Sequence, residues 1–319
     1  MPLTLLKKRD SNSGIDKEIA LLLSQLSGDS VYELMELSNM ARVKNIGNTI
    51  DLCSIVNAKS GGCSEDCHFC AQSVHNNTGV DQYPLFTKKQ LLESAIAAKR
   101  LGVKRFCIVT SGKRPSDKEL DEICYFVYEL RTLGLLPCAT LGLLDITALR
   151  RLKEAGLHRY HHNLETSEEF FNEICTTHTY WDKIRTIQAA KTLKLSVCSG
   201  GIFGLGETWE DRIDMAFALK DLDVDCVPIN FLTPVSGTPL GDINPMTPAE
   251  ALKIIAIYRL ILPDRSIRVC GGRDKTLKDL QSFIFTAGAD GLLLGNYLTT
   301  SGRNPDDDIR MIKDLGLKI

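Results

Sequence analysis

The sequence predicts an α/β fold, specifically a (β/α)8 barrel of the TIM type that is complete or nearly so. Short runs rich in branched apolar residues alternate with amphipathic segments, and this alternation continues from about residue 30 to the C-terminus. The 319 residues are enough for one large domain with a full core. A doubly wound open sheet is the alternative architecture. We expect a barrel domain at 31–319, preceded by a tail or outer helix at 1–30.

Eight runs have the composition of parallel strands that are buried on both faces. They span residues 50–58, 105–110, 138–141, 159–164, 196–202, 226–232, 267–270 and 291–294. Capping signals mark the starts of helices between them. Ser or Thr precedes Glu or Gln by three residues at 87–90, 116–119 and 166–169, and Thr247 is followed by a proline. The order of strands and caps therefore predicts repeated strand–helix units.

Composition excludes several classes of protein. The net charge of -2 argues against a nucleic-acid-binding surface, and no apolar run reaches the roughly 20 residues that cross a bilayer. The short apolar stretch near Met1 does not form a signal peptide. Eleven cysteines in such a chain indicate metal ligation in a reducing compartment. We expect a cytoplasmic protein without nucleic-acid or membrane partners.

The most specific motif is a cysteine triplet in the loop after the first predicted strand. Cys63, Cys67 and Cys70 lie within eight residues. Thiolates hold iron–sulfur clusters, and three of them leave one iron of a four-iron cluster open for a substrate or cofactor. A structural zinc site usually needs a second pair of ligands, and an odd triplet argues against disulfides. In a (β/α)8 barrel this loop lies at the face that carries the active site.

The triplet, with Phe69 before its last cysteine, resembles the signature of the radical S-adenosylmethionine superfamily. Residues 54–73 around it resemble the biotin synthase family, and the resemblance covers nearly all of the chain from about Ser30. It implies that the triplet holds a [4Fe–4S] cluster on which S-adenosylmethionine is reductively cleaved, with Phe69 beside the cofactor. It also implies radical insertion of sulfur into dethiobiotin, which forms the thiophane ring of biotin.

The same resemblance implies an auxiliary cluster that donates the sulfur. Cys107, Cys138 and Cys198 stand in sequence contexts that match three ligands of the family's auxiliary [2Fe–2S] cluster, and Arg268 matches the fourth. Cys270 shares a strand face with Arg268, so it offers a fourth thiolate that would suit a four-iron auxiliary cluster. Cys270 is alternatively a small core residue.

Four other cysteines carry weaker signals. Cys226 lies on the same strand face as Asn230 and is a weaker candidate of the same kind as Cys270. Cys53, Cys124 and Cys175 have the appearance of structural residues.

The resemblance also implies residues that bind S-adenosylmethionine. Asn163 and Glu165 would contact its ribose, Lys183 would meet its carboxylate, and Gly200 and Gly201 would lie beside its adenine. Glu165 is longer than the aspartate typical of the family, and Lys183 stands where the family has an arginine, so the charge stays while the bidentate fork is lost.

Three polar residues are implied on the substrate side. Asn163 would also reach the substrate, Asn230 would hold the ureido ring of dethiobiotin, and Lys59 would meet its carboxylate. His161 replaces an asparagine of the family motif, and a hydrogen-bonded buried histidine is its alternative interpretation.

The partners implied by the resemblance are dethiobiotin, an electron donor such as flavodoxin or ferredoxin, iron–sulfur assembly proteins and a second copy of the chain in a homodimer. Two alternatives remain at this point. One is another radical enzyme on the same scaffold, such as a hydrogenase maturase or a mutase, which needs no sulfur donor on the strands. The other is a non-enzymatic iron–sulfur or zinc protein, which does not account for the loop position of the triplet or for the polar residues.

Overall fold

A computed structural model describes residue 3 and residues 14–319. Its strands are all parallel to their neighbours and form one sheet in the order β5-β4-β3-β2-β1-β9-β8-β7-β6. The strands are β1 (Asp51–Lys59), β2 (Arg105–Thr110), β3 (Leu136–Thr140), β4 (Arg159–His161), β5 (Ser196–Cys198), β6 (Gly201–Phe203), β7 (Cys226–Phe231), β8 (Ser266–Val269) and β9 (Gly291–Leu293).

The sheet closes on itself between β5 and β7. Cys198 on β5 pairs with Cys226 on β7, and Gly201 on β6 pairs with Ile229 on the same strand. β5 and β6 are thus two pieces of the single strand predicted at 196–202, so that nine strands within residues 14–319 fill eight positions of a barrel. The break lies at Gly200, where a Cβ atom would approach the Pro228 carbonyl oxygen to 2.1 Å. The predicted (β/α)8 barrel is confirmed.

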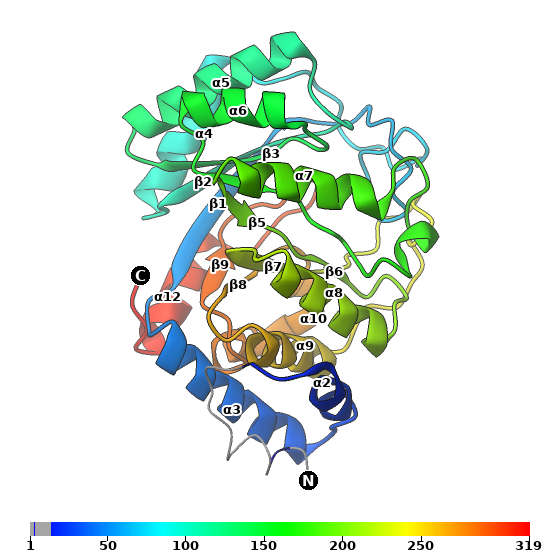
Figure 1. Cartoon of the computed structure of the whole chain (residues 1–319). Helices are drawn as coiled ribbons and strands as arrows, with labels where there is room; N and C mark the ends of the chain where they lie inside the picture. Colours follow the sequence, from blue (N-terminus) through cyan, green and yellow to red (C-terminus); the bar gives the residue numbers. More distant parts are fainter. Residues whose placement is uncertain (1–2, 4–13) are drawn as a thin grey trace.

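Helices surround the barrel in the alternating order that the sequence predicts (Figure 1). They are α2 (Lys17–Ser24), α3 (Asp29–Asn45), α4 (Lys88–Arg100), α5 (Asp117–Thr132), α6 (Ile146–Ala155), α7 (Tyr180–Thr192), α8 (Trp209–Asp221), α9 (Pro248–Ile261), α10 (Arg273–Leu277), α11 (Phe283–Thr286) and α12 (Pro305–Asp314), with short 3-10 turns η1 (Phe171–Glu173) and η2 (Lys278–Leu280). α2 packs on α8 and α9, and α3 lies along α9 outside the barrel (Figure 1).

The predicted caps at Thr87, Ser116 and Thr247 are confirmed. Thr87 and Ser116 form complete capping boxes at the starts of α4 and α5, and Thr247 caps α9 with a proline in its first turn. The predicted helix start at Thr166 is wrong.

At that place the Ser167 hydroxyl donates to Asp211 Oδ1 at 2.6 Å and accepts from the Phe170 backbone N–H at 3.0 Å. These bonds hold the chain in a loop, because a serine side chain competes with helical hydrogen bonding. The next α-helix, α7, begins only after Thr179, where Thr179 and Asp182 form a capping box.

A buried ion pair holds the last strand in the barrel. Arg259 on α9 is fully buried and pairs with Asp290, which directly precedes β9. Asp290 also accepts hydrogen bonds from the Ile267 backbone N–H at 2.6 Å and the Ser266 hydroxyl at 2.9 Å, both on β8. This carboxylate therefore ties α9, β8 and β9 together.

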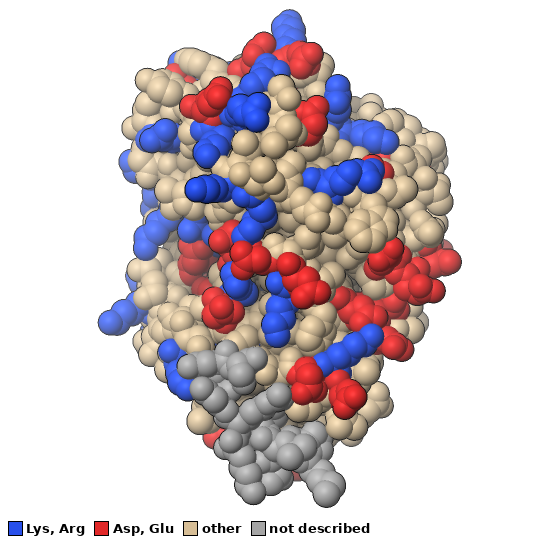
Figure 2. Space-filling model, in the orientation of Figure 1, with Lys and Arg blue, Asp and Glu red and all other residues tan. Residues whose placement is uncertain are grey.

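The surface carries both signs of charge. On the face drawn in Figure 2, basic and acidic side chains occur together, consistent with a net charge of -2. Among the residues that the structure describes, no helix has both the length and the apolar character to span a membrane.

Candidate active site inside the barrel

A cavity of about 320 Å³ lies inside the barrel and brings together most of the side chains that the sequence singles out. The predicted site residues that line it are Phe69, Cys70, Cys107, Cys138, Asn163, Glu165, Cys198, Asn230, Arg268 and Cys270. Since these residues come from the loop after β1, from β2, β3, β5, β7 and β8, and from the segments after β4 and β8, the cavity is built by strands far apart in sequence. This is the place where a parallel barrel positions its reactive groups.

The cysteine triplet lies on a tightly bonded loop. The Asn76 side chain donates to the carbonyl oxygens of Cys67 at 3.2 Å and Cys70 at 2.8 Å, and the Val74 N–H donates to the Cys63 carbonyl at 2.8 Å. All three thiols are free and partly exposed. Burial raises the pKa of the Cys70 thiol to about 11. Three soft thiols on a loop at the mouth of the cavity fit the donor set of a four-iron cluster.

A second set of thiols lines the deeper part of the cavity. Cys107, Cys138, Cys198 and Cys270 are all buried and free. Burial raises the pKa of Cys138 to about 12. Thiols in such a place become thiolates only when a metal binds them.

Two arginines lie among these thiols. Arg268 and Arg159 line the same cavity, and buried guanidinium nitrogens of both, Nε of Arg268 and Nη1 of Arg159, have no hydrogen-bond partner. Arg268 Nη2 pairs with Asp51. Unpartnered buried donors beside a ring of thiols fit an anionic, thiolate-bound cluster.

Asn163 and Glu165 follow β4 and face the cavity together. The Asn163 amide donates to Glu165 Oε2 at 3.2 Å, and its oxygen accepts from the Gly200 N–H at 3.2 Å. Glu165 adopts φ +76°, a left-handed conformation that is uncommon for a residue with a side chain. Burial raises the pKa of the Glu165 carboxyl group.

Lys183 comes to this group from the first turn of α7. It is 8% exposed, and its ammonium lies 5.9 Å from the ring centre of Phe171. Among the described residues the ammonium has neither an ion pair nor a hydrogen bond. Lys183 thus brings to this group a positive charge that no carboxylate among the described residues pairs with, and such a charge fits a ligand carboxylate.

The two glycines after β5 have a packing role of their own. A Cβ atom on Gly201 would approach the Glu165 carbonyl oxygen to 2.3 Å, as one on Gly200 would approach the Pro228 carbonyl. Strand packing alone therefore requires small residues here, whether or not a ligand lies alongside.

Asn230 and His161 are held by internal hydrogen bonds. The Asn230 amide donates to the Gly201 carbonyl at 3.1 Å and accepts from the Gly271 N–H at 3.0 Å, which fixes its orientation. His161 Nδ1 lies 2.9 Å from the Thr140 hydroxyl. Burial lowers the pKa of His161 to about 4, so the ring is neutral at physiological pH.

Lys59 is not brought into the cavity lining. Its ammonium pairs with Glu119 Oε1 at 2.6 Å, and the side chain is 29% exposed. The carboxylate partner that the sequence assigned to Lys59 is thus supplied by the protein itself.

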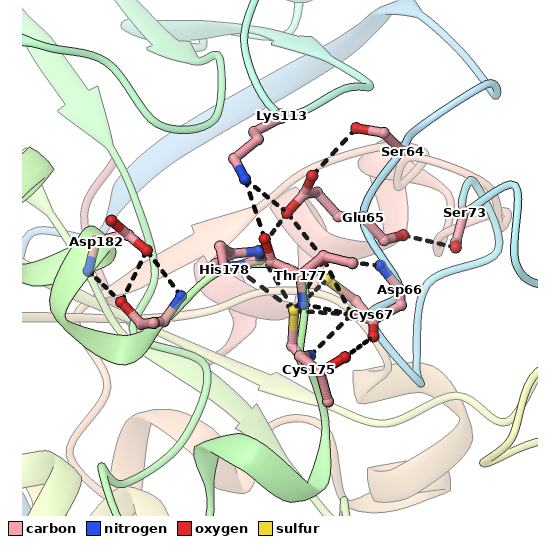
Figure 3. Close-up of polar contacts among 12 residues, drawn as sticks. Ser64, Glu65, Asp66, Cys67, Ser73, Lys113, Cys175, Thr177, His178 and Asp182 are labelled. Atoms are coloured by element: carbon pink, nitrogen blue, oxygen red, sulfur yellow. Dashed lines mark hydrogen bonds and ion pairs between the residues drawn. The ribbon is translucent and has the colours of Figure 1, made fainter.

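Sequence reasoning missed two cysteines. Cys53 lines the cavity and packs against Cys270, and the period-two pattern of β1 could have revealed it, because Cys53 shares a face with the cavity residue Ile55. Cys175 lies in the loop before α7, where no periodicity applies. Its Sγ is 3.8 Å from Cys67 Sγ (Figure 3).

Two family descriptions match the chain. Residues 58–219 match the Radical SAM superfamily, and residues 228–318 match the Biotin and Thiamin Synthesis associated domain. The first covers the triplet loop and the strands through β6, and the second covers most of β7, with β8 and β9.

Curated relatives are similar over nearly the whole chain. A biotin synthase of Thermodesulfovibrio yellowstonii is 51% identical over 298 residues, which cover 93% of this chain and 94% of the relative. A biotin synthase of Geobacter sulfurreducens is 48% identical over 320 residues, covering 100% of this chain and 97% of the relative.

Solved structures share the fold at low identity. Methylornithine synthase (PylB) superposes with a TM-score of 0.86 at 20% identity, covering 100% of this chain and 97% of that one. The FeFe-hydrogenase maturase HydG from Carboxydothermus hydrogenoformans gives a TM-score of 0.83 at 15% identity, covering 99% and 78%. At such low sequence identities, the structural similarity supports the barrel fold alone.

Proposed function

The chain belongs to the biotin synthase family of the radical S-adenosylmethionine superfamily, and on that premise we propose how its own residues insert sulfur into dethiobiotin. The enzyme uses S-adenosylmethionine, a [4Fe–4S] cluster and an auxiliary iron–sulfur cluster. The observation that carries the residue assignment is the pair of separate thiol sets, one on the loop after β1, which lines the cavity through Cys70, and one on the strands that line the same cavity.

Cys63, Cys67 and Cys70 would hold the [4Fe–4S] cluster. When bound, S-adenosylmethionine and the two clusters supply a primary carbon radical that removes hydrogen from the substrate and the sulfur atom that replaces it. The hydrogen bonds from Asn76 to the Cys67 and Cys70 carbonyl oxygens hold the backbone of the loop before any cluster is present.

Lys183, Glu165 and Asn163 orient S-adenosylmethionine. Lys183 binds its carboxylate, because the ammonium lies over the Phe171 ring and forms no ion pair with a carboxylate of the described residues. Glu165 and Asn163 meet the ribose hydroxyls, since the carboxylate accepts hydrogen bonds and the amide retains a free donor hydrogen. Their shared hydrogen bond keeps both side chains on the cavity face.

Asn230 binds the ureido ring of dethiobiotin. Its amide carries two donor hydrogens and an oxygen with two lone pairs, and Gly201 and Gly271 use one of each. One donor and one acceptor site therefore remain, which match the carbonyl and N–H groups of a cyclic urea. Phe69 and Leu232 add apolar walls that exclude water from a radical site.

Cys107, Cys138 and Cys198 hold the auxiliary cluster, and we assign its fourth position to Cys270. Arginine normally keeps its proton, and Arg268 is engaged by Asp51. Cys270 is buried on the same wall of the cavity and presents a thiol. Four thiolates suit a four-iron auxiliary cluster, with Arg268 as a nearby positive charge.

The family also indicates the surroundings of the reaction. Dethiobiotin is the substrate. We propose that flavodoxin or ferredoxin delivers the electrons, that iron–sulfur assembly proteins load the clusters, and that the chain works as a homodimer in the cytoplasm.

One assay with three variants tests this assignment. The anaerobically reconstituted protein is incubated with S-adenosylmethionine, reductant and dethiobiotin, and 5′-deoxyadenosine and biotin are measured by mass spectrometry. Wild type should form both products. Cys67→Ala should form neither, whereas Cys198→Ala should keep forming 5′-deoxyadenosine and lose biotin. Cys124→Ala, which changes a half-buried cysteine on α5, is the matched control and should behave as wild type.

Two outcomes would contradict the assignment. Normal 5′-deoxyadenosine formation by Cys67→Ala would remove the triplet from cofactor cleavage. Normal biotin formation by Cys198→Ala would remove the deeper thiols from sulfur donation.

A further inference from the structure

Cys67, Cys175 and His178 converge at the mouth of the barrel, although Cys67 lies more than 100 positions before the other two. Their ligand atoms all lie within 4.8 Å of one another (Figure 3). Cys175 and His178 are buried, and Cys67 is partly exposed. The loop between η1 and α7 brings Cys175 and His178 against the triplet loop.

The distances have the size that one tetrahedral ion requires. Two sulfurs bound at about 2.3 Å to a tetrahedral zinc lie about 3.8 Å apart, and a sulfur and an imidazole nitrogen lie about 3.6 Å apart. Here the two sulfurs are 3.8 Å apart. Cys175 Sγ lies 3.3 Å from His178 Nδ1 and 3.8 Å from His178 Nε2.

A carboxylate orients the imidazole. Glu65 is buried, and its Oε2 lies 2.6 Å from His178 Nδ1, which is also the ring nitrogen nearer to Cys175 Sγ. An ion bound by His178 in this orientation would take the Nδ1 lone pair in place of the proton that Nδ1 shares with Glu65, and the carboxylate would keep Thr177 and Lys113 as partners. Thr177 Oγ1 also donates to Glu65 Oε2 at 2.9 Å, so the supporting carboxylate is itself held in place.

Two carboxylates lie close to the three ligands. Two thiolates neutralise a divalent ion, and the Glu65 carboxylate faces Lys113 Nζ at 3.7 Å. Asp66 Oδ1 lies 3.2 Å from Cys175 Sγ and accepts hydrogen bonds from the Thr176 and Thr177 backbone N–H groups, which offset part of its charge. Two thiolates and an imidazole are ligands that favour zinc, iron and cobalt over magnesium or calcium.

We propose that the cluster-free chain binds one divalent transition-metal ion through Cys67, Cys175 and His178. Cys67 belongs to both sets of ligands, so the single ion and the [4Fe–4S] cluster exclude each other. Occupation by zinc would block loading of the cluster, whereas occupation by Fe²⁺ would place the first iron beside the loop that must assemble it.

Cobalt is a suitable probe, because thiolate-bound Co²⁺ absorbs visibly. Metal-free, reduced wild type and Cys175→Ala are titrated anaerobically with Co²⁺. The bound cobalt and its thiolate charge-transfer absorption are recorded for both proteins. Cys175→Ala should bind one ion fewer than wild type and lose the corresponding absorption. Cobalt held by the deeper barrel thiols contributes equally to both chains and cancels in the difference.

Three further variants separate this site from the cluster loop. Cys63→Ala should keep the ion, because Cys63 is not one of the three ligands, while losing the [4Fe–4S] cluster on reconstitution. Cys175→Ala should lose the single ion and still form the [4Fe–4S] cluster on reconstitution. Cys67→Ala should lose both the ion and the cluster. His178→Gln keeps both thiols and should shift the cobalt spectrum and weaken binding at least tenfold.

Repeating the titration with Zn²⁺ and Fe²⁺ distinguishes the two metals by affinity. Thermal unfolding of every variant shows whether it remains folded, and Cys175→Ser provides a second replacement if Cys175→Ala does not. Equal cobalt content and spectra for wild type and a folded Cys175 variant would overturn the proposal. Loss of the ion in Cys63→Ala would also overturn it, because the metal would then belong to the triplet. These results do not depend on whether the chain makes biotin.

Discussion

Lys183 is the side chain whose replacement has the most direct consequence for cofactor binding. It lies on α7, is 8% exposed, and has no ion pair among the described residues. A hydrogen bond to a charged group contributes about 1–3 kcal/mol, which corresponds to a roughly 5- to 150-fold change in dissociation constant. Lys183→Met keeps most of the apolar stem and removes the charge. We therefore expect S-adenosylmethionine to bind to this variant weaker by a factor in that range.

Isothermal titration calorimetry on the cluster-loaded protein measures the dissociation constant. Two further variants serve as comparisons, one at Lys183 itself and one elsewhere on α7. Lys183→Arg should bind at least as tightly as wild type, because a guanidinium forms two parallel hydrogen bonds with a carboxylate. Lys191→Met is the matched control, since Lys191 also lies on α7 but pairs with Asp223 at 2.8 Å. Its affinity should equal that of wild type.

Folding must be separated from binding in this experiment. Because the Lys183 ammonium forms neither an ion pair nor a hydrogen bond with the described residues, Lys183→Met should leave the unfolding temperature nearly unchanged. A dissociation constant equal to that of wild type, in a variant that remains folded and loaded with its cluster, would place Lys183 outside the cofactor site and refute the reasoning.

Four further predictions concern the auxiliary cluster, the capping box of α7, its pH dependence and the barrel itself. Mössbauer spectra of the reconstituted protein should show a four-iron auxiliary cluster, with about eight irons per chain, whereas a two-iron auxiliary cluster would give about six. Cys270→Ser should disrupt the auxiliary cluster and spare S-adenosylmethionine cleavage. A two-iron spectrum of the wild type, together with normal biotin formation by Cys270→Ser, would show that Cys270 is a core residue. Thr179→Ala should lower the free energy of unfolding in urea by about 1 kcal/mol, because it removes an N-cap, and an unchanged midpoint would contradict this. The hydrogen bond from the Thr179 backbone N–H lowers the pKa of Asp182 to about 2. The stabilisation by this carboxylate is therefore complete above its ordinary pKa of 3.8 and is lost as the pH falls toward 2. In Asp182→Asn, the free energy of unfolding should depend less on pH in this range. Asp290→Ala should cost about 3–5 kcal/mol, since it leaves the buried Arg259 charge unpaired, and a loss below 1 kcal/mol would show that the pair is dispensable.

The sequence by itself determined the barrel and the chemical class of its ligands. Branched apolar runs such as 105–110 favour buried strands, and the structure places β2 at Arg105–Thr110. Local capping boxes such as Thr87 with Gln90 involve residues three apart, so the helix starts that depend on them were predictable. The cysteine triplet could be predicted as a set of cluster ligands because its three residues also lie close together in the sequence.

Where a side chain had a competing partner elsewhere in the fold, local reasoning failed. Thr166 does not begin a helix, because Ser167 bonds to Asp211, a residue 44 positions away. The ion pair of Lys59 with Glu119, 60 positions away, was likewise not visible in local sequence, and the role of Lys59 toward the substrate stays a prediction.

Only the tertiary structure decided how the cysteines group. Cys53 became a cavity residue when the barrel closed around it, and Cys175 came to lie 3.8 Å from Cys67 although 108 positions separate them. No periodicity of a strand or helix connects two loops, so the convergence of Cys67, Cys175 and His178 depends on how the barrel places the loop after β1 beside the loop before α7. The sequence supplies these three side chains, and the tertiary structure sets the distances between them.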